Sequence, residues 1–222
     1  MRIAVFGDSF APKFSPNWVW WKQLRQFGHE VTCYGESGSS INFSAQLINQ
    51  NANSYDINIW CLTTVGRFSV KVNDQWIHLT TNSRNISIFN EHIIDAVDSY
   101  HKYLFDWSNE IFTATAIVEY LCNKFKNILV VPCFSIPLFI DQEHFNLFTV
   151  SERDAANYFP NQSLSDIYNH YNDIRAAHLS KENNKVLAQL INDNLQPGVF
   201  SVDYNEFVSP EESVDTLFQK KL

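Results

Sequence analysis

The sequence lacks any apolar run long enough to cross a membrane. A spanning helix needs roughly 20 apolar residues, and the 222 residues contain no such run. At the amino terminus, Ile3-Ala4-Val5-Phe6 meets Gly7 and Asp8, so the run is too short for the core of a signal peptide. We therefore expect a cytoplasmic protein without a membrane span.

Positive charge and paired cysteines are also scarce. Against 24 acidic residues stand 16 Lys and Arg, and the net charge is −8. An acidic surface repels phosphate backbones, so we expect no nucleic acid partner. The four cysteines form no Cys-x-x-Cys pair, and His, Asp and Glu nowhere show ligand spacing, so no metal site is indicated. We expect the cysteines to be buried thiols rather than disulfides. They are Cys33, Cys61, Cys122 and Cys133.

Short apolar runs alternate with helical patterns, which is typical of parallel strands joined by helices. We expect an α/β fold, a flavodoxin-like three-layer α/β/α sandwich around a mainly parallel five-stranded sheet, in one domain spanning 1–222. The expected strands are 3–6, 30–34, 57–62, 128–131 and 145–150. The expected helices are 18–27, 41–49, 91–125 with a break near 106–108 capped by Ser108, and one after Ser180 as its cap.

Residues 67–92 do not follow this pattern of simple crossovers. Apolar and polar residues alternate from Phe68, and Asn73-Asp74 is a turn signal. We expect an inserted hairpin-like loop here, and a carboxyl-terminal tail over about 198–222.

Three of the expected strands end in unusual loops: Gly7-Asp8-Ser9, residues 35–40 and residues 63–67. Ligands of an open parallel sheet bind outside the carboxyl ends of its strands, so these loops predict a site. A serine there needs a base to take its proton. Of the seven histidines, His178 is the best placed, just before a capped helix; His170, after Asp166, is a rival.

Val5-Phe6-Gly7-Asp8-Ser9-Phe10 resembles the first sequence block of the SGNH (GDSL-type) hydrolases. Gly38, within residues 35–40, resembles the second block of that family, and His178-Leu179-Ser180 resembles the fifth. The order of the three elements agrees with the family. The resemblance implies the SGNH hydrolase fold and ester hydrolysis by a nucleophilic serine.

The resemblance also implies a role for individual residues. Ser9 would attack the ester carbonyl, the N–H groups of Ser9 and Gly38 would hold the oxyanion, and His178 would shuttle the proton. The third family block carries an Asn as a further oxyanion donor, but alignment puts Thr64 there. Either Thr64 or Arg67, three residues on, would supply this donor.

The fifth block departs from the family as well. The family has an Asp three residues before the His, where this chain has Arg175. Asp173 lies five residues before His178 and would orient the imidazole from a slightly longer loop. Otherwise a backbone carbonyl orients the ring, and the pair is a Ser-His dyad.

The leading hypothesis is therefore an enzyme without a cofactor that hydrolyses a carboxylic ester, on a small molecule or a glycan, through an acyl-serine intermediate. An alternative is a weakly active or inactive binding or structural protein on the same fold, such as a phage component. A nucleotide binder is a third class, which the absence of a Gly-x-Gly-x-x-Gly or Walker pattern disfavours.

Overall fold

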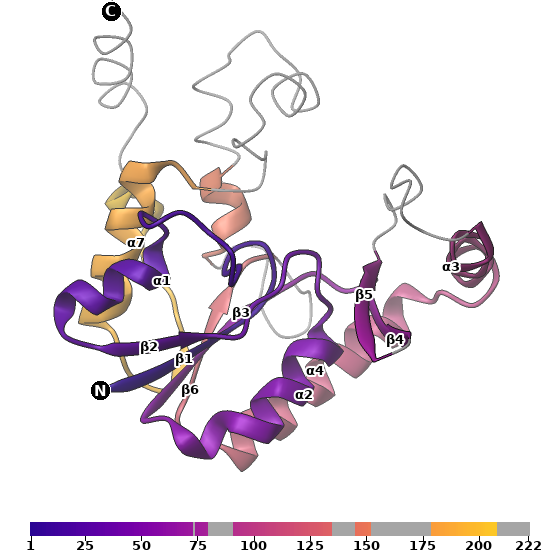
Figure 1. The fold of residues 1–222 in the computed structure, drawn as a ribbon, viewed down its shortest axis with the longest axis horizontal. Helices are drawn as coiled ribbons and strands as arrows, with labels where there is room; N and C mark the ends of the chain where they lie inside the picture. The colour runs from indigo at the N-terminus through magenta and orange to yellow at the C-terminus, as the bar shows by residue number, and fades with distance from the viewer. Residues whose placement is uncertain (73, 80–90, 135–144, 152–178, 208–222) are drawn as a thin grey trace, which may run out of the picture.

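The computed structural model describes residues 1–72, 74–79, 91–134, 145–151 and 179–207 (Figure 1). Five parallel strands form one sheet in the order β2-β1-β3-β6-β7. This confirms the predicted α/β fold. In chain order the strands are β1 (Arg2–Phe6), β2 (Glu30–Cys33), β3 (Ile57–Leu62), β6 (Ile128–Pro132) and β7 (Gly198–Val199).

Helices cover both faces of the sheet and complete the predicted three layers (Figure 1). On one face lie α1 (Trp20–Gln23), which continues as a 3-10 turn over Leu24–Phe27, and α7 (Lys181–Asp193). On the other lie α2 (Ile41–Asn51) and α4 (Trp107–Lys124).

The central strand β3 shows why this sequence forms a covered sheet. Every residue of β3 is buried, as expected for a parallel strand between two helical layers. Successive side chains point to opposite faces. Ile59 and Cys61 join the core under α1 and α7, whereas Trp60 and Leu62 join the core under α2 and α4.

The helix boundaries follow side-chain caps. Ser180 Oγ accepts the Asn183 N–H at 3.1 Å and begins α7, as predicted. The expected long helix is divided into α3 (Glu91–Tyr103) and α4, but its cap is Asp106 and not Ser108. The Asp106 carboxylate accepts the Asn109 N–H at 3.0 Å, and its negative charge also suits the positive end of the helix dipole.

The prediction of a fifth strand over Phe145–Val150 is wrong. Residues 147–151 are helical, because Asn146 Oδ1 accepts the Thr149 N–H at 2.9 Å and caps the turn. Leu147 and Val150 are buried three residues apart, a helical spacing. The fifth strand is β7, which pairs with Leu129 and Val130 of β6.

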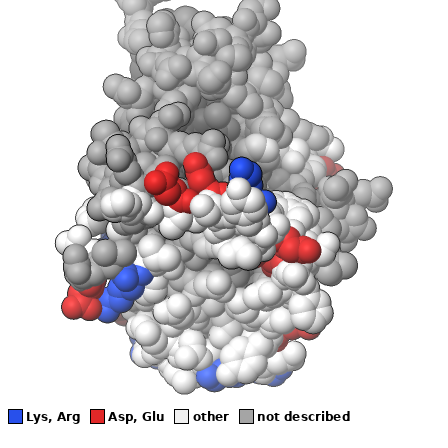
Figure 2. All heavy atoms as spheres, turned by 90° about the vertical axis from the view of Figure 1, so that its right-hand side faces the viewer, with Lys and Arg blue, Asp and Glu red and all other residues white. Residues whose placement is uncertain are grey.

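The insertion after β3 contains the predicted hairpin. β4 (Phe68–Val72) and β5 (Gln75–Leu79) are antiparallel, and Asp74 adopts φ 62° in the turn. The Phe68 ring contacts Tyr100 of α3, with ring centroids 4.5 Å apart. Hairpin and α3 lie at the right of Figure 1, beyond α2 and α4. From that side most of the described surface is neither acidic nor basic (Figure 2).

All four cysteines are free thiols, as expected. Cys33, Cys61 and Cys133 are buried, and Cys122 is partly buried. Burial raises the pKa of Cys33 to about 12 and that of Cys133 well above its ordinary value. These thiols are packing groups rather than nucleophiles.

The loops after β1 and β2 touch at Gly35. A Cβ atom at Gly35 would lie 1.8 Å from the carbonyl oxygen of Ala11, and Lys13 N–H donates to the Gly35 carbonyl at 2.7 Å. Gly28 differs because it adopts φ 82° after the first helix and has open space around it.

We expect Gly35→Ala to destabilise the protein by at least about 3 kcal/mol, since backbone must move to admit the methyl group. Gly28→Ala is the matched control and should cost only about 1 kcal/mol, the cost of a left-handed alanine. Urea unfolding followed by tryptophan fluorescence measures both. Equal losses would show that the two loops separate easily at Gly35.

Candidate active site

In the sheet, the connections that leave the neighbouring strands β1 and β2 go to opposite faces. α1, which follows β1, and α2, which follows β2, lie on opposite faces of the sheet. The crevice of such a sheet lies outside the carboxyl ends of its strands. Ser9, Gly38, Thr64 and Arg67, the predicted site residues that the structure describes, all lie on the loops after β1, β2 and β3.

Gly7 lets the chain turn sharply at the end of β1. It has φ 146°, and a Cβ atom there would lie 2.5 Å from the Cβ of Cys61 and 2.7 Å from its carbonyl oxygen. Only glycine fits this approach to β3. The turn brings Asp8 inside the protein, whereas Ser9 remains half-buried.

The carboxylate of Asp8 joins the loops after β1 and β3. It is completely buried. Oδ2 accepts hydrogen bonds from Thr63 Oγ1 at 2.7 Å and from Arg67 Nη1 at 2.6 Å, and Oδ1 accepts the Phe10 N–H at 3.1 Å. Local sequence patterns could not predict these partners of Asp8, because both cross-loop contacts span more than 50 residues.

Arg67 therefore already has a defined contact in the structure. Its side chain is 15% exposed and pairs with Asp8, and its guanidinium carbon lies 5.3 Å from the centre of the Phe134 ring. Thr64, the other candidate for the third oxyanion donor, is half-buried beside a hollow of about 20 Å³ that Ser40 and Glu110 also line.

Two backbone N–H groups on the loops after β1 and β2 have no acceptor among the described residues. In the loop after β2, Glu36 N–H donates to Gly7, Ser39 N–H to Glu36, and Ser40 N–H to Ser69. Among the residues that the structure describes, neither Gly38 N–H nor Ser9 N–H has an acceptor. Gly38 adopts φ 79°, in the left-handed region that favours glycine.

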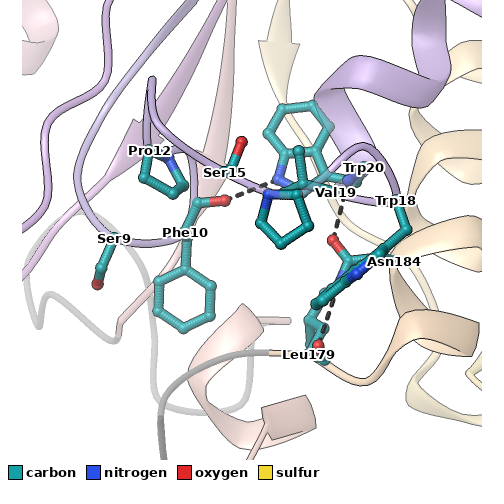
Figure 3. A pocket seen from close by; sticks show the side chains of 10 residues that line it. Ser9, Phe10, Pro12, Ser15, Trp18, Val19, Trp20, Leu179 and Asn184 are labelled. Carbon is teal, nitrogen blue, oxygen red and sulfur yellow. Dashed lines mark hydrogen bonds between the residues drawn. The ribbon is translucent and has the colours of Figure 1, made fainter. Parts of the chain in front are cut away.

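The Ser9 hydroxyl likewise has no hydrogen-bond partner within the described ranges. Ser9 stands at the edge of a pocket of about 50 Å³ lined mainly by apolar side chains, including Phe10 and Trp18 (Figure 3). Its hydroxyl points away from the Trp20 ring (Figure 3). The predicted base His178, its rival His170 and the predicted Asp173 lie outside the described residues.

Leu179, the residue after His178, is tied to the residue after Ser9. Its carbonyl accepts from Asn184 Nδ2 at 2.9 Å, and Asn184 Oδ1 accepts the Trp20 N–H at 2.9 Å. Trp20 Nε1 donates to the Phe10 carbonyl at 2.8 Å (Figure 3). Sequence reasoning missed Asn184, because its partner Trp20 lies 164 residues away in the sequence.

The described residues also bear on whether the chain has a metal site or a helix that could span a membrane. Within the described part of the chain, no group of three or more His, Cys, Asp or Glu side chains could hold a metal ion. No helix of that part is long and apolar enough to cross a bilayer.

Comparisons find distant similarity to known structures. No protein-family model matches the chain, and no curated protein does. A lipolytic protein of the G-D-S-L family from Desulfitobacterium hafniense is similar at 13% identity and TM-score 0.44, over 86% of this chain and 98% of that one. The psychrotrophic esterase EstA from Pseudoalteromonas sp. is similar at 11% identity and TM-score 0.44, over 86% and 94%. A GDSL-like lipase from Parabacteroides merdae is similar at 14% identity and TM-score 0.41, over 88% and 96%. This is a distant likeness, which says nothing of the reaction.

The buried Asp8–Arg67 pair should be essential to stability. We expect Arg67→Ala to lower the free energy of unfolding by about 3–5 kcal/mol, because it leaves a buried carboxylate without its cation. Arg2→Ala is the matched control: Arg2 pairs with Asp56 on the surface, where the side chains are 57% and 44% exposed, so stability should hardly change.

Chemical denaturation at pH 7 compares these two variants with the wild type. If Arg67→Ala were as stable as Arg2→Ala, the loops after β1 and β3 would not depend on this ion pair.

Proposed function

We propose that this chain is a serine esterase of the SGNH (GDSL) type, which hydrolyses a carboxylic ester through an acyl-serine intermediate. The observation that carries this proposal is a pair of backbone donors without acceptors on two joined loops, one of which carries Ser9. Ser9 N–H and Gly38 N–H have no acceptor among the described residues, and the loops that carry them are joined by the 3.0 Å bond from Glu36 N–H to the Gly7 carbonyl.

The chemistry follows from these groups. Ser9 Oγ attacks the ester carbonyl carbon while its proton passes to His178, and the carbonyl oxygen becomes an oxyanion. The N–H groups of Ser9 and Gly38 donate to that oxyanion, and such donors contribute about 3–4 kcal/mol each to kcat. The intermediate expels the alcohol with the proton from His178. Water then hydrolyses the acyl-serine by the same route.

The bonds around Leu179 support His178 as the base over His170. A peptide bond joins His178 to Leu179, and consecutive Cα atoms are about 3.8 Å apart. Leu179 is connected through Asn184 and Trp20 to the Phe10 carbonyl. The chain directly after position 178 is thereby tied to the segment that carries Ser9.

The third oxyanion donor in this proposal is Thr64 or Arg67. Arg67 donates a hydrogen bond from Nη1 to Asp8, and its guanidinium group carries further N–H groups. Thr64 has one hydroxyl with a shorter reach. The substrate class is an acyl ester, such as an acetyl ester, of a small molecule or a glycan.

Ser9→Ala should abolish hydrolysis of p-nitrophenyl acetate, with a fall in kcat of roughly 10⁴-fold or more, and should abolish labelling by a fluorophosphonate. Ser15→Ala is the matched control, because Ser15 lines the same pocket as Ser9 and has no role in the proposal. It should retain both properties. A folded wild type that neither turns over nor labels would favour the binding or structural alternative, which glycan binding assays would then address.

The base and its orienting carboxylate are separable by substitution. His178→Ala should lose activity as Ser9→Ala does, whereas His170→Ala should keep it. Asp173→Asn should lower kcat by roughly 10⁴-fold, as loss of the carboxylate does in a Ser-His-Asp triad. Steady-state kinetics of the three purified variants measure this. Unchanged activity in Asp173→Asn would identify a Ser-His dyad instead.

A further inference from the structure

Three side chains connect the inserted hairpin to the loop that carries Gly38. His78, on β5, has Nε2 at 2.9 Å from Glu36 Oε2 and Nδ1 at 2.8 Å from Ser69 Oγ of β4. Ser69 Oγ accepts the Ser40 N–H at 3.0 Å. The hairpin thus holds the loop on both sides of Gly38, at Glu36 and at Ser40.

The hydrogen bonds between Ser40, Ser69, His78 and Glu36 form one series in which each group donates to the next acceptor. A carboxylate only accepts hydrogen bonds, so His78 Nε2 carries a proton and donates a hydrogen bond to Glu36. In a neutral imidazole the other nitrogen, Nδ1, then accepts the hydrogen bond that the Ser69 hydroxyl donates. The Ser69 oxygen in turn accepts from Ser40. Each donor in this series of hydrogen bonds has one acceptor, which fixes the ring orientation of His78.

Packing holds His78 in the same position. Its side chain is only 11% exposed. The ring meets the Phe43 ring of α2 edge-on, with centroids 4.7 Å apart, and Phe43 also meets the Trp76 ring of β5. A Cβ atom at Gly38 would lie 3.7 Å from the Cβ of His78. Strand β5 therefore lies close to the Gly38 backbone.

We propose that His78 is a positioning residue that fixes the Gly38 loop so that the Gly38 N–H meets the oxyanion. This inference rests on the esterase function proposed above. The inserted hairpin then contributes to the reaction by supporting the Gly38 loop. Because the oxyanion is absent from the bound ester and develops in the transition state and the tetrahedral intermediate, loss of this support lowers kcat and leaves KM nearly unchanged.

The test compares kinetics and a transition-state analogue across variants of His78. In His78→Ala we expect kcat for p-nitrophenyl acetate to fall by roughly 10- to 100-fold, with KM within about twofold. The inhibition constant of phenylboronic acid, which forms a tetrahedral anion on serine, should rise in parallel. His78→Gln keeps an N–H for Glu36 and should restore part of both losses.

His29→Ala is the matched control. His29 precedes β2 at the opposite, amino edge of the sheet, and its Nε2 lies 2.9 Å from Asn192 Oδ1, within hydrogen-bond distance. Its kcat and inhibition constant should equal those of the wild type. Thermal unfolding of each variant identifies any that misfold; if His78→Ala does so, Ser69→Ala takes its place in the comparison.

The outcomes separate the two proposals. An active wild type with unchanged kcat and inhibition constant in His78→Ala, or in Ser69→Ala in its place, would overturn the positioning role alone. A folded wild type that neither hydrolyses the ester nor reacts with a fluorophosphonate would overturn the esterase function, and the positioning role with it.

Discussion

The buried carboxylate of Asp8 is the constraint on which the edge of the sheet depends. A charge without exposure requires partners, and Asp8 finds them in Thr63, Arg67 and the Phe10 N–H. The first two come from the loop after β3, and the third fixes the turn around Ser9. One carboxylate thereby sets where Ser9 lies relative to the neighbouring loop.

The same edge is held from two further directions. On the α1 and α7 face, Asn184 links the Trp20 N–H to the Leu179 carbonyl. On the other side, the hairpin holds Glu36 and Ser40 through His78 and Ser69. The loops around Ser9 and Gly38 are thus held by polar groups that pair with one another within the protein, which restricts the arrangement of each loop.

The sequence was sufficient where the signal was local. Strand β3 was predicted from an apolar run, and the start of α7 was predicted from its cap, Ser180. The hairpin was predicted from the turn signal Asn73-Asp74. Each of these signals lies within a few residues of the sequence. The strand expected over Phe145–Val150 failed because one Asn146 cap outweighed a β-like composition. Asn184 and His78 were missed as site residues because their partners are far away in sequence: 164 residues separate Trp20 from Asn184, and 42 separate Glu36 from His78.

The short length of β7 affects whether this edge of the sheet can pair with strands of other molecules in solution. An outer strand presents unpaired amide and carbonyl groups, which are a template for the strand of another chain. In the described sheet β7 is the outer strand opposite β2, and it consists of Gly198 and Val199 alone. An incoming strand would find too few groups there for a continuous ladder, so this edge resists the growth of intermolecular sheets.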